Sequence, residues 1–149
     1  MDQISVNRYE PVLTIGTAAN KLGISVQSLR LYEQEGLIIP HKTASGRRMY
    51  SFHDIDRLTC IREMLTTHGL NMSGIKRLMS MIPCWDYKGG LDDDCVNCSA
   101  YYEAQGPCWT VEKVGAKCEA TECRTCPVYR VEINCNKIKE IIFGHSRPK

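Results

Sequence analysis

The chain has 149 residues and a formal net charge of +2, so it has room for one ordinary domain or two small ones. It opens without a charged-then-apolar leader, and no uninterrupted apolar run approaches the ~18 residues of a membrane span. These features disfavour the secreted and membrane classes, and we expect a cytoplasmic protein.

Charge and cysteine are unevenly distributed along the chain. Residues 1–82 hold ten Lys and Arg against seven acids, residues 83–126 four against eight, and residues 127–149 five against two. Eight of the nine cysteines lie between Cys84 and Cys135. Thiols stay reduced in the cytoplasm, so clustered Cys-x-x-Cys pairs favour metal binding over redox chemistry or inert cysteines. The acidic, sulfur-rich segment is a poor phosphate binder, and DNA contacts are expected outside it.

Two short helices are expected near the start of the chain. In residues 15–22 four apolar side chains share one face, and Gly23 can end that helix in the left-handed conformation. Ser25 can cap a second helix that stops at Gly36. Its inward side carries Val26, Leu29 and Tyr32, and its outward side carries Gln27, Ser28, Arg30 and Leu31. Two such helices joined by a tight turn with a glycine are typical of a helix-turn-helix.

A hairpin wing is expected next. Residues 37–40 and 47–50 are short extended pieces on either side of a polar turn at residues 41–46. The hairpin brings together Lys42, Arg47 and Arg48, and a basic hairpin beside a recognition helix can hold the flanking DNA backbone. The alternative is that the arginines only solvate an edge strand.

Two further helices are expected before Pro83. Ser51 and Asp54 have the spacing of a capping box and open the first, which has Ile55, Leu58, Ile61 and Leu65 inward and ends at His68-Gly69. Asn71 can cap the second, which Pro83 terminates. The methionines are expected to fill the core or the helices rather than to bind metal, namely Met49, Met64, Met72, Met79 and Met81.

Five runs of residues in this half form a recognisable pattern. They are Leu13-Thr14-Ile15-Gly16, Ser25-x-x-Ser28-Leu29-Arg30-Leu31-Tyr32-Glu33, Gly36-Leu37-Ile38-x-Pro40, Gly46-Arg47-Arg48-x-Tyr50-Ser51 and Asp54-Ile55-x-Arg57-Leu58. The pattern resembles the winged helix-turn-helix of the MerR transcription regulators. Within that superfamily, Arg30-Leu31-Tyr32-Glu33 and Gly69-Leu70-Asn71-x-x-Gly74-Ile75-Lys76-Arg77 are most similar to the heat-shock repressors of the HspR type.

The resemblance implies a homodimer on an inverted-repeat DNA operator, with the helix from Ser25 to Glu35 in the major groove and the hairpin from His41 to Arg48 as its wing. It implies backbone contacts for Arg30 and Tyr50 and wing contacts for Arg47 and Arg48. Leu31 replaces a tyrosine of many relatives and lacks its hydroxyl. The candidate DNA-binding residues are Gln27, Ser28, Arg30, Leu31, Tyr32, Lys42, Arg47, Arg48 and Tyr50. The HspR type also suggests a chaperone co-repressor.

The second half contains an internal repeat. Cys84-Trp85 precedes Cys95-x-x-Cys98-x-x-Tyr101, and Cys108-Trp109 precedes Cys123-x-x-Cys126-x-x-Tyr129. Two residues between cysteines let both sulfurs turn onto one ion, so each pair is half of a tetrathiolate site. The expected ligands are Cys84, Cys95, Cys98, Cys108, Cys118, Cys123 and Cys126. They permit one four-thiolate site with spare cysteines, or two sites if another ligand such as Cys135 joins.

Zinc is slightly favoured as the metal, and an iron–sulfur cluster is the alternative. Trp85 and Trp109 are expected to cover the sulfur site. The run Asp92-Asp93-Asp94 is expected to be a solvated loop rather than a hard-cation site. The double Cys-Trp arrangement is similar to the two-CW domain, a small cysteine-rich module of bacterial regulatory and signalling proteins, which implies one folded unit over Cys84 to Tyr129.

A narrow apolar seam closes the chain, formed by Val131, Cys135, Ile138 and Ile142 on a helix that would end at Gly144. Cys135 is expected in the core, with metal ligation as the alternative. We therefore predict a mainly α chain: an arm at residues 1–11, a winged helix-turn-helix with a small β hairpin at 12–82, a loop-dominated cysteine module at 83–127, and a helix and tail at 128–149.

The predicted function is DNA-binding transcriptional regulation rather than catalysis, with a cysteine module that senses a metal or redox signal or stabilises the dimer. One alternative is a DNA-bending recombination accessory factor with a structural zinc module. A second is a thiol–disulfide oxidoreductase that uses Cys95/Cys98 or Cys123/Cys126. This second alternative lacks the strand-helix-strand pattern of such enzymes and a nearby His or Lys to activate the thiolate.

Overall fold

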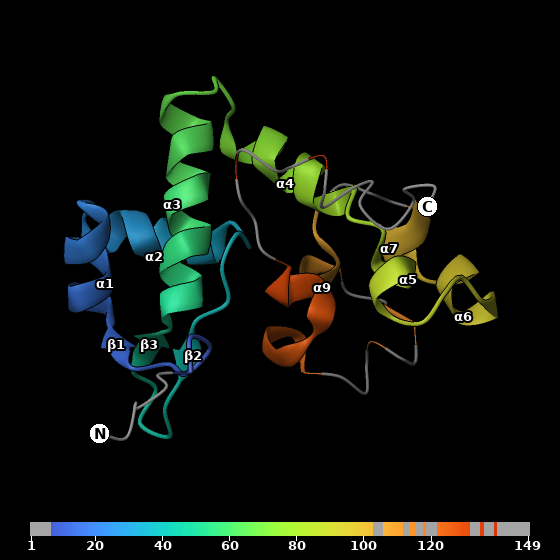
Figure 1. Cartoon of the computed structure of the whole chain (residues 1–149), viewed down its shortest axis with the longest axis horizontal. Helices are drawn as coiled ribbons and strands as arrows, with labels where there is room; N and C mark the ends of the chain where they lie inside the picture. Colours follow the sequence, from blue (N-terminus) through green and yellow to red (C-terminus); the bar gives the residue numbers. More distant parts are fainter. Residues whose placement is uncertain are drawn as a thin grey trace, which may run out of the picture. The chain divides into compact units, whose positions relative to one another are not determined.

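The computed structural model describes residues 7–102, 106–111, 114–115, 118, 122–131, 135 and 139 (Figure 1). Contacts divide the chain into two compact units, Met1–Arg62 and Glu63–Lys149. This division falls twenty residues before the predicted domain limit at residue 82, and the four domain ranges expected from the sequence stay predictions. Among the described helices, none has the length and apolar character needed to cross a membrane.

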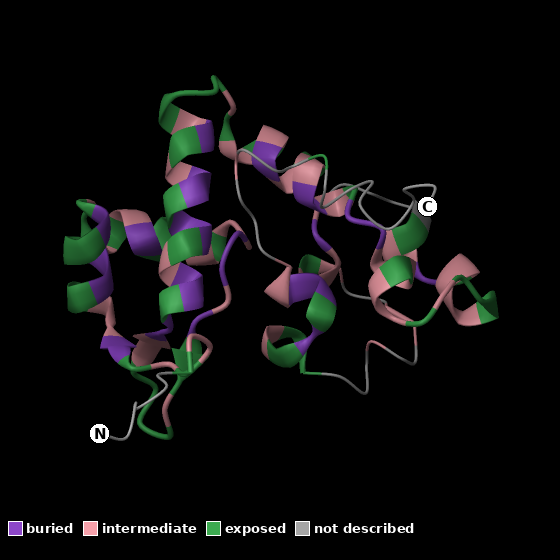
Figure 2. Ribbon diagram, viewed as in Figure 1, coloured by how far each residue is buried: buried purple, intermediate pink, exposed green. Residues whose placement is uncertain are grey.

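The first unit is mainly helical with a small sheet, as the sequence predicts. Its elements are β1 (Leu13–Thr14), α1 (Ile15–Leu22), α2 (Val26–Gln34), β2 (His41–Lys42), β3 (Arg48–Tyr50) and α3 (Phe52–Thr66), of which α3 continues past the unit's limit. The strands form one antiparallel sheet in the order β1-β3-β2. Buried residues recur along α1, α2 and α3 (Figure 2), with Ala18, Leu29, Leu58 and Ile61 at 0% exposure.

The helix-turn-helix is confirmed, together with the caps that define it. Gly23 ends α1 with φ of 66°, a left-handed conformation that a residue with a side chain rarely adopts. The Ser25 hydroxyl accepts a hydrogen bond from the Ser28 N–H at 3.0 Å and begins α2. The side chain of Thr14 caps α1 in the same way, a cap that the sequence pattern did not predict. Three residues between the helices therefore suffice for the turn.

We expect Ser25→Ala to lower the free energy of unfolding by about 1 kcal/mol, because the first turn of α2 loses its hydrogen-bond acceptor. Urea denaturation followed by circular dichroism measures this change. Ser73→Ala is the matched control, since Ser73 is an exposed serine inside α4 (Met72–Ser80) rather than its cap. Equal effects of the two substitutions would contradict the capping role of Ser25.

The wing exists, but its first strand does not lie where the sequence predicts it. Residues 37–40 are not a strand; β2 begins at His41, inside the predicted turn, and pairs with β3. Leu37 and Ile38 are instead core residues at 0% and 1% exposure. The Leu37 carbonyl accepts a hydrogen bond from Nε of the buried Arg57 at 3.1 Å, so a side chain takes the place of a strand partner.

The start of α3 is a reciprocal capping box, as predicted from Ser51 and Asp54. The Ser51 N–H donates to Asp54 Oδ2 at 2.8 Å, and the Asp54 N–H donates to Ser51 Oγ at 3.1 Å. Both residues are buried. Farther along α3, the Arg62 guanidinium donates to the carbonyl of Leu22, one of the last carbonyls of α1. These contacts hold α3 against the helix-turn-helix.

The second unit contains α4 and a series of single helical turns. Asn71 caps α4 through the Gly74 N–H at 2.8 Å, as predicted. The short elements are α5 (Cys84–Tyr87), α6 (Asp93–Val96), α7 (Ser99–Tyr102), η1 (Cys108–Thr110), η2 (Cys123–Thr125) and α9 (Pro127–Arg130). Two of the four residues of the apolar seam predicted for the tail, Ile138 and Ile142, lie outside the described residues.

The methionines divide between the core and the surface. Met64 and Met79 are buried, at 3% and 5% exposure, as expected of core-filling residues. Met81 is 57% exposed and lies just after the end of α4, so it fills neither the core nor a helix as expected.

Candidate nucleic-acid interface and cysteine pockets

One face of α2 is exposed and carries the groups that DNA contact requires. Gln27 and Arg30 are exposed, Ser28 is half-buried, and Leu31 is 42% exposed. The opposite face carries Leu29 at 0% exposure and packs into the core. The amide and the guanidinium can hydrogen-bond base edges or phosphates, and the leucine can make apolar contact with a thymine methyl group. We call this exposed face the α2 face.

Two of the candidate DNA-binding residues lie elsewhere. Tyr32 is 7% exposed and Tyr50 is 0% exposed, so both rings belong to the core of the first unit. Burial raises the pKa of the Tyr32 hydroxyl, and the nearby Arg62 partly offsets that rise. Their burial gives both tyrosines a structural role, and DNA contact by either one stays a prediction.

Glu33 connects the wing to α2. Its carboxylate accepts a hydrogen bond from Nε of Arg48 at 2.5 Å and lies 3.6 Å from Nζ of Lys42. The hydrogen bond to Glu33, followed by the charge of Glu33, raises the pKa of Arg48. Lys42 and Arg48 therefore have a protein partner on α2, while Arg47 is exposed in the wing. The sequence did not predict this role of Glu33, whose position after Tyr32 gives no local sign of it.

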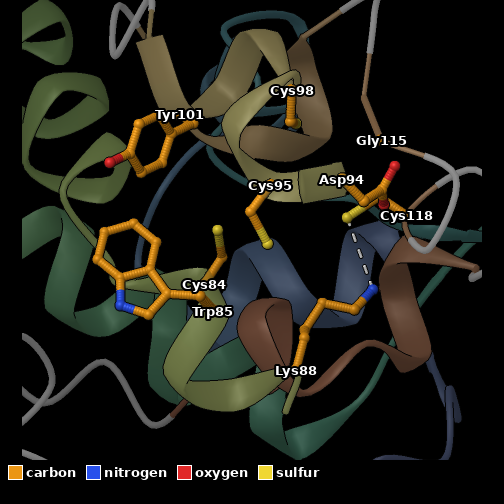
Figure 3. Close-up of a pocket in the computed structure, with 9 residues that line it drawn as sticks. All are labelled: Cys84, Trp85, Lys88, Asp94, Cys95, Cys98, Tyr101, Gly115 and Cys118. Atoms are coloured by element: carbon orange, nitrogen blue, oxygen red, sulfur yellow. Dashed lines mark hydrogen bonds between the residues drawn. The ribbon is translucent and has the colours of Figure 1, made fainter. Parts of the chain in front are cut away.

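The seven cysteines expected to bind metal are all free thiols and line two pockets in the second unit. The first pocket is lined by Cys84, Cys95 and Cys98 together with Trp85 and Tyr101. Figure 3 shows Cys84 and Cys95 pointing toward one another in this pocket, beside the two aromatic rings. The second pocket is lined by Cys108, Cys123, Cys126, Trp109 and Tyr129. Each pocket thus contains one copy of the sequence repeat.

The two copies also repeat one another in local geometry. In each Cys-x-x-Cys pair the N–H of the second cysteine donates to the carbonyl of the first at 3.0 Å. Each tryptophan lies edge-on to the tyrosine of its own copy, with ring centroids 5.7 Å apart for Trp85 and Tyr101 and 5.0 Å apart for Trp109 and Tyr129. The expected aromatic cover is therefore present as Trp–Tyr pairs. A proline precedes each Cys-Trp unit and is a further element of the repeat.

Cys118 and Lys88 line both pockets. Nζ of Lys88 donates to Sγ of Cys118 at 3.6 Å, as the dashed line in Figure 3 marks. Cys118 has no counterpart in the first copy of the repeat, and no spacing rule indicates that it lies between the copies. Only the folded arrangement identifies these two residues as shared.

The comparisons with known proteins concern the first half of the chain. The family model of the MerR HTH family regulatory proteins matches residues 13–82. Residues 13–82 are a MerR-type domain. This match contains the α2 face and the wing and ends before Cys84, so the cysteine pockets lie outside it.

Several curated regulators resemble the MerR-type domain. GlnR of Bacillus anthracis is 38% identical over 74 residues, which are 50% of this chain and 57% of GlnR. The putative heat shock protein HspR of Streptomyces coelicolor is 37% identical over 86 residues, 54% of this chain and 57% of HspR. The mercuric resistance operon regulatory protein of Bacillus cereus is 38% identical over 69 residues, which are 46% of this chain and 52% of that protein. The chain thus spans only about half the length of these relatives.

The acidic run beside the first pocket contributes to its structure. Asp92 and Asp93 are exposed, as expected of a solvated loop. The Asp92 carboxylate nevertheless accepts a hydrogen bond from the Cys95 N–H at 3.0 Å, which caps α6 and orients Cys95. Asp94 is half-buried and lines the first pocket with Gly115. The run is therefore not a loop throughout, because Asp93 and Asp94 form the first turn of α6.

Gly115→Ala should destabilise the second unit by no more than about 1 kcal/mol, because an added Cβ would lie 2.6 Å from Oδ2 of Asp94, at the end of a half-buried side chain that can rotate away. Thermal unfolding monitored by tryptophan fluorescence measures the loss. Asp94→Ala in the same chain removes the obstructing carboxylate, so the double variant should recover most of that cost. Gly16→Ala is the control, since nothing lies within 4 Å of its added Cβ. A double variant with strictly additive losses would contradict the steric explanation.

Four of the thiols lack the lowered pKa of an activated nucleophile. Burial raises the pKa of Cys108 to about 12, and burial is also the first cause of the raised pKa values of Cys84, Cys118 and Cys123. Contrary to our expectation, a lysine does lie beside a thiol. Lys88 lowers the pKa of Cys118, but burial has the larger effect. Buried thiols of high pKa are poor catalysts of disulfide exchange, which argues against an oxidoreductase that uses Cys123.

Within the described residues, three ligand atoms within 4.8 Å of one another occur at Glu63, His68 and Cys135. Cys135 is disulfide-bonded, so its sulfur is not a thiolate here. No three of the seven described free thiols lie as close as 4.8 Å to one another, whereas Zn–S bonds of about 2.3 Å place sulfurs ~3.8 Å apart. A metal in either pocket would therefore have to draw its ligands inward.

Proposed function

We propose that the protein is a sequence-specific DNA-binding transcriptional regulator located in the cytoplasm. The observation that carries the proposal is the exposed α2 face on a capped helix inside a MerR-type domain. The named relatives GlnR and the mercuric resistance operon regulatory protein are regulators, which supports the same role here.

In the proposed complex, α2 enters the major groove of an inverted-repeat operator. Gln27 and Leu31 would contact base edges, with the amide of Gln27 suited to adenine and the side chain of Leu31 to thymine. Arg30 and Arg47 would contact phosphates, which fixes the position of the domain without specifying sequence. An inverted repeat presents two half-sites of the same sequence, so we propose that the protein binds its operator as a homodimer.

Selection from random DNA with the full chain, followed by nuclease footprinting, tests this function. We expect an enriched motif with dyad symmetry and a footprint on natural DNA that contains it. Binding that random competitor DNA removes as readily as motif DNA would overturn the proposal. A footprint at a recombination attachment site, with bent DNA, would instead favour the accessory-factor alternative.

We further propose that the cysteine module binds zinc and either senses a signal or stabilises the dimer. The donor set consists of soft sulfur ligands, which suits zinc or iron–sulfur clusters and not magnesium or calcium. Elemental analysis and an absorption spectrum after anaerobic purification distinguish zinc from an iron–sulfur cluster. The presence of iron with sulfide would overturn the proposal that the module binds zinc. If removal of the metal leaves the footprint on DNA unchanged, the module is not a sensor, and only its stabilising role remains.

A chaperone co-repressor is the least supported element of the proposal. It follows only from similarity to HspR, and that similarity covers 54% of this chain. A chaperone that slows migration of the protein–operator complex would support it, and an unchanged complex would remove it.

A further inference from the structure

The number and placement of the thiols suggest more than one metal ion. Three free thiols belong to the first pocket alone, namely Cys84, Cys95 and Cys98. Three others belong to the second pocket alone, namely Cys108, Cys123 and Cys126. Cys118 lines both pockets. Each pocket thus has three thiols of its own and a fourth that it shares.

Other distributions of metal leave this arrangement unexplained. A single tetrathiolate site would use four thiols and leave the other three without a function. Two separate tetrathiolate sites, or two four-iron clusters with four cysteines each, would need eight thiols. Seven free thiols line the two pockets, and Cys135 lines neither of them. If cysteine supplies every ligand, seven thiols complete two four-coordinate ions when one sulfur is shared.

We propose that the cysteine module binds two zinc ions in one cluster, in which the Cys118 thiolate bridges the ion of the first pocket and the ion of the second. Each zinc then has four sulfur ligands, three from its own copy of the repeat and one from Cys118. A structural site of this kind leaves no coordination position open for substrate, in agreement with a non-catalytic protein.

The surroundings of Cys118 fit a bridging ligand. Seven thiolates outnumber the four positive charges of two zinc ions by three, so the cluster needs nearby cations. The ammonium of Lys88 lines both pockets and already donates to Sγ of Cys118. Gly115, three residues before Cys118, also lines the first pocket with Asp94, although both Gly115 and Cys118 follow the second Cys-Trp unit in sequence. Hydrogen bonds to a metal-bound sulfur and aromatic cover are the usual supports of such a site.

Metal counting and cadmium spectroscopy of the full chain test the cluster directly. Native mass spectrometry should find two zinc ions per chain. In the protein loaded with cadmium-113, proton–cadmium correlation spectra should show two cadmium signals, with the β protons of Cys118 correlated to both and those of the other six cysteines to one each. One ion per chain, two ions without a shared cysteine, or iron with sulfide would each overturn the proposal.

Single substitutions provide a second test with matched controls. Cys98→Ser and Cys126→Ser should each weaken the binding of only one zinc ion. The other ion should resist removal by a chelator as well as it does in the parent protein. Cys118→Ser should speed release of both ions more than about tenfold, the lower limit seen even for outer-shell changes. Because Trp85 and Trp109 are the only tryptophans and lie in different pockets, Trp85→Phe and Trp109→Phe variants report on each pocket separately. Faster release confined to one pocket in Cys118→Ser, or unchanged release in both, contradicts the bridge.

The bridged cluster presupposes the zinc site proposed above, but not DNA binding. A protein that holds two bridged ions and ignores operator DNA would keep the cluster and lose the regulatory function. A protein that protects an operator in a footprint but holds one zinc ion, or iron, would keep the regulatory function and lose the cluster.

Discussion

Removal of the metal by a strong chelator is expected to unfold the cysteine module, with a greater loss of stability than any single substitution proposed above. The helical elements that carry its thiols are three or four residues long, too short to persist without other support. Apparent binding free energies of structural zinc are about 10–16 kcal/mol, and such energy also supports folding. Hydrogen exchange should therefore show loss of protection at residues 84–98 and 106–111 after chelation.

The helices α1 and α2 serve as the internal control, since they contain no cysteine ligand. Their exchange should change little in the same experiment. Restoring zinc should recover protection in the module, whereas magnesium should not. A module whose protection and tryptophan emission are identical with and without metal would refute a structural metal.

Zinc occupancy should fall on acidification. Burial raises the pKa values of Cys84, Cys108, Cys118 and Cys123, so these thiols hold their protons at neutral pH in the metal-free fold. Zinc binds the thiolates, and each ligand therefore releases a proton when it coordinates. Protons compete with zinc more strongly as pH decreases, and affinity rises with pH. Zinc titrations at several pH values, with proton release followed by calorimetry, measure the effect; a pH-independent affinity would contradict it.

Arg30→Ala is expected to weaken DNA binding about 10- to 100-fold for operator and random DNA alike. Arg30 is exposed on α2, and a phosphate contact adds affinity that does not depend on base sequence. The slope of log affinity against log salt concentration should fall in magnitude by about 1, because one fewer counterion is released per domain. Titrations of labelled DNA at several salt concentrations measure both quantities.

Two substitutions on the same helix serve as comparisons. Gln27→Ala should lower affinity for the operator much more than for random DNA, since an amide can hydrogen-bond a base edge. Gln34→Ala is the control, because Gln34 is exposed at the last position of α2 and is not among the candidate contacts. Arg30→Ala that behaves like Gln34→Ala would exclude the α2 face as the DNA contact.

Much of the first unit, and the start of α4 in the second, was predictable because the signals are local. Gly23, Ser25, Ser51 and Asn71 act on backbone groups no more than five residues away, and each occupies the cap position expected of it. The wing strand was misplaced because Leu37 and Ile38 have the apolar character of a strand, while the carbonyl of Leu37 is satisfied by Arg57, twenty residues along the chain. No short window of sequence contains that contact.

The cysteine module shows the same division. The repeat of Cys-Trp and Cys-x-x-Cys is visible in the sequence, and it correctly groups the thiols of each pocket. The choice between one site with spare cysteines and two sites cannot be made from spacing, because spacing within a copy says nothing about how the copies meet. The sequence offers Cys135 as an eighth ligand, whereas the folded chain makes Cys118 common to both pockets.

Sequence patterns predicted the helix-turn-helix, its caps, the candidate groups on α2 and the two copies of the thiol repeat, since each depends on periodicity or on short spacings along the chain. The burial of Tyr50, the ion pairs of Glu33 with Lys42 and Arg48, and the position of Cys118 and Lys88 in both pockets became visible in the folded chain. Each of these features is a contact between residues that lie far apart in the sequence and come together on folding. The neighbouring sequence of such a residue therefore does not identify its partner.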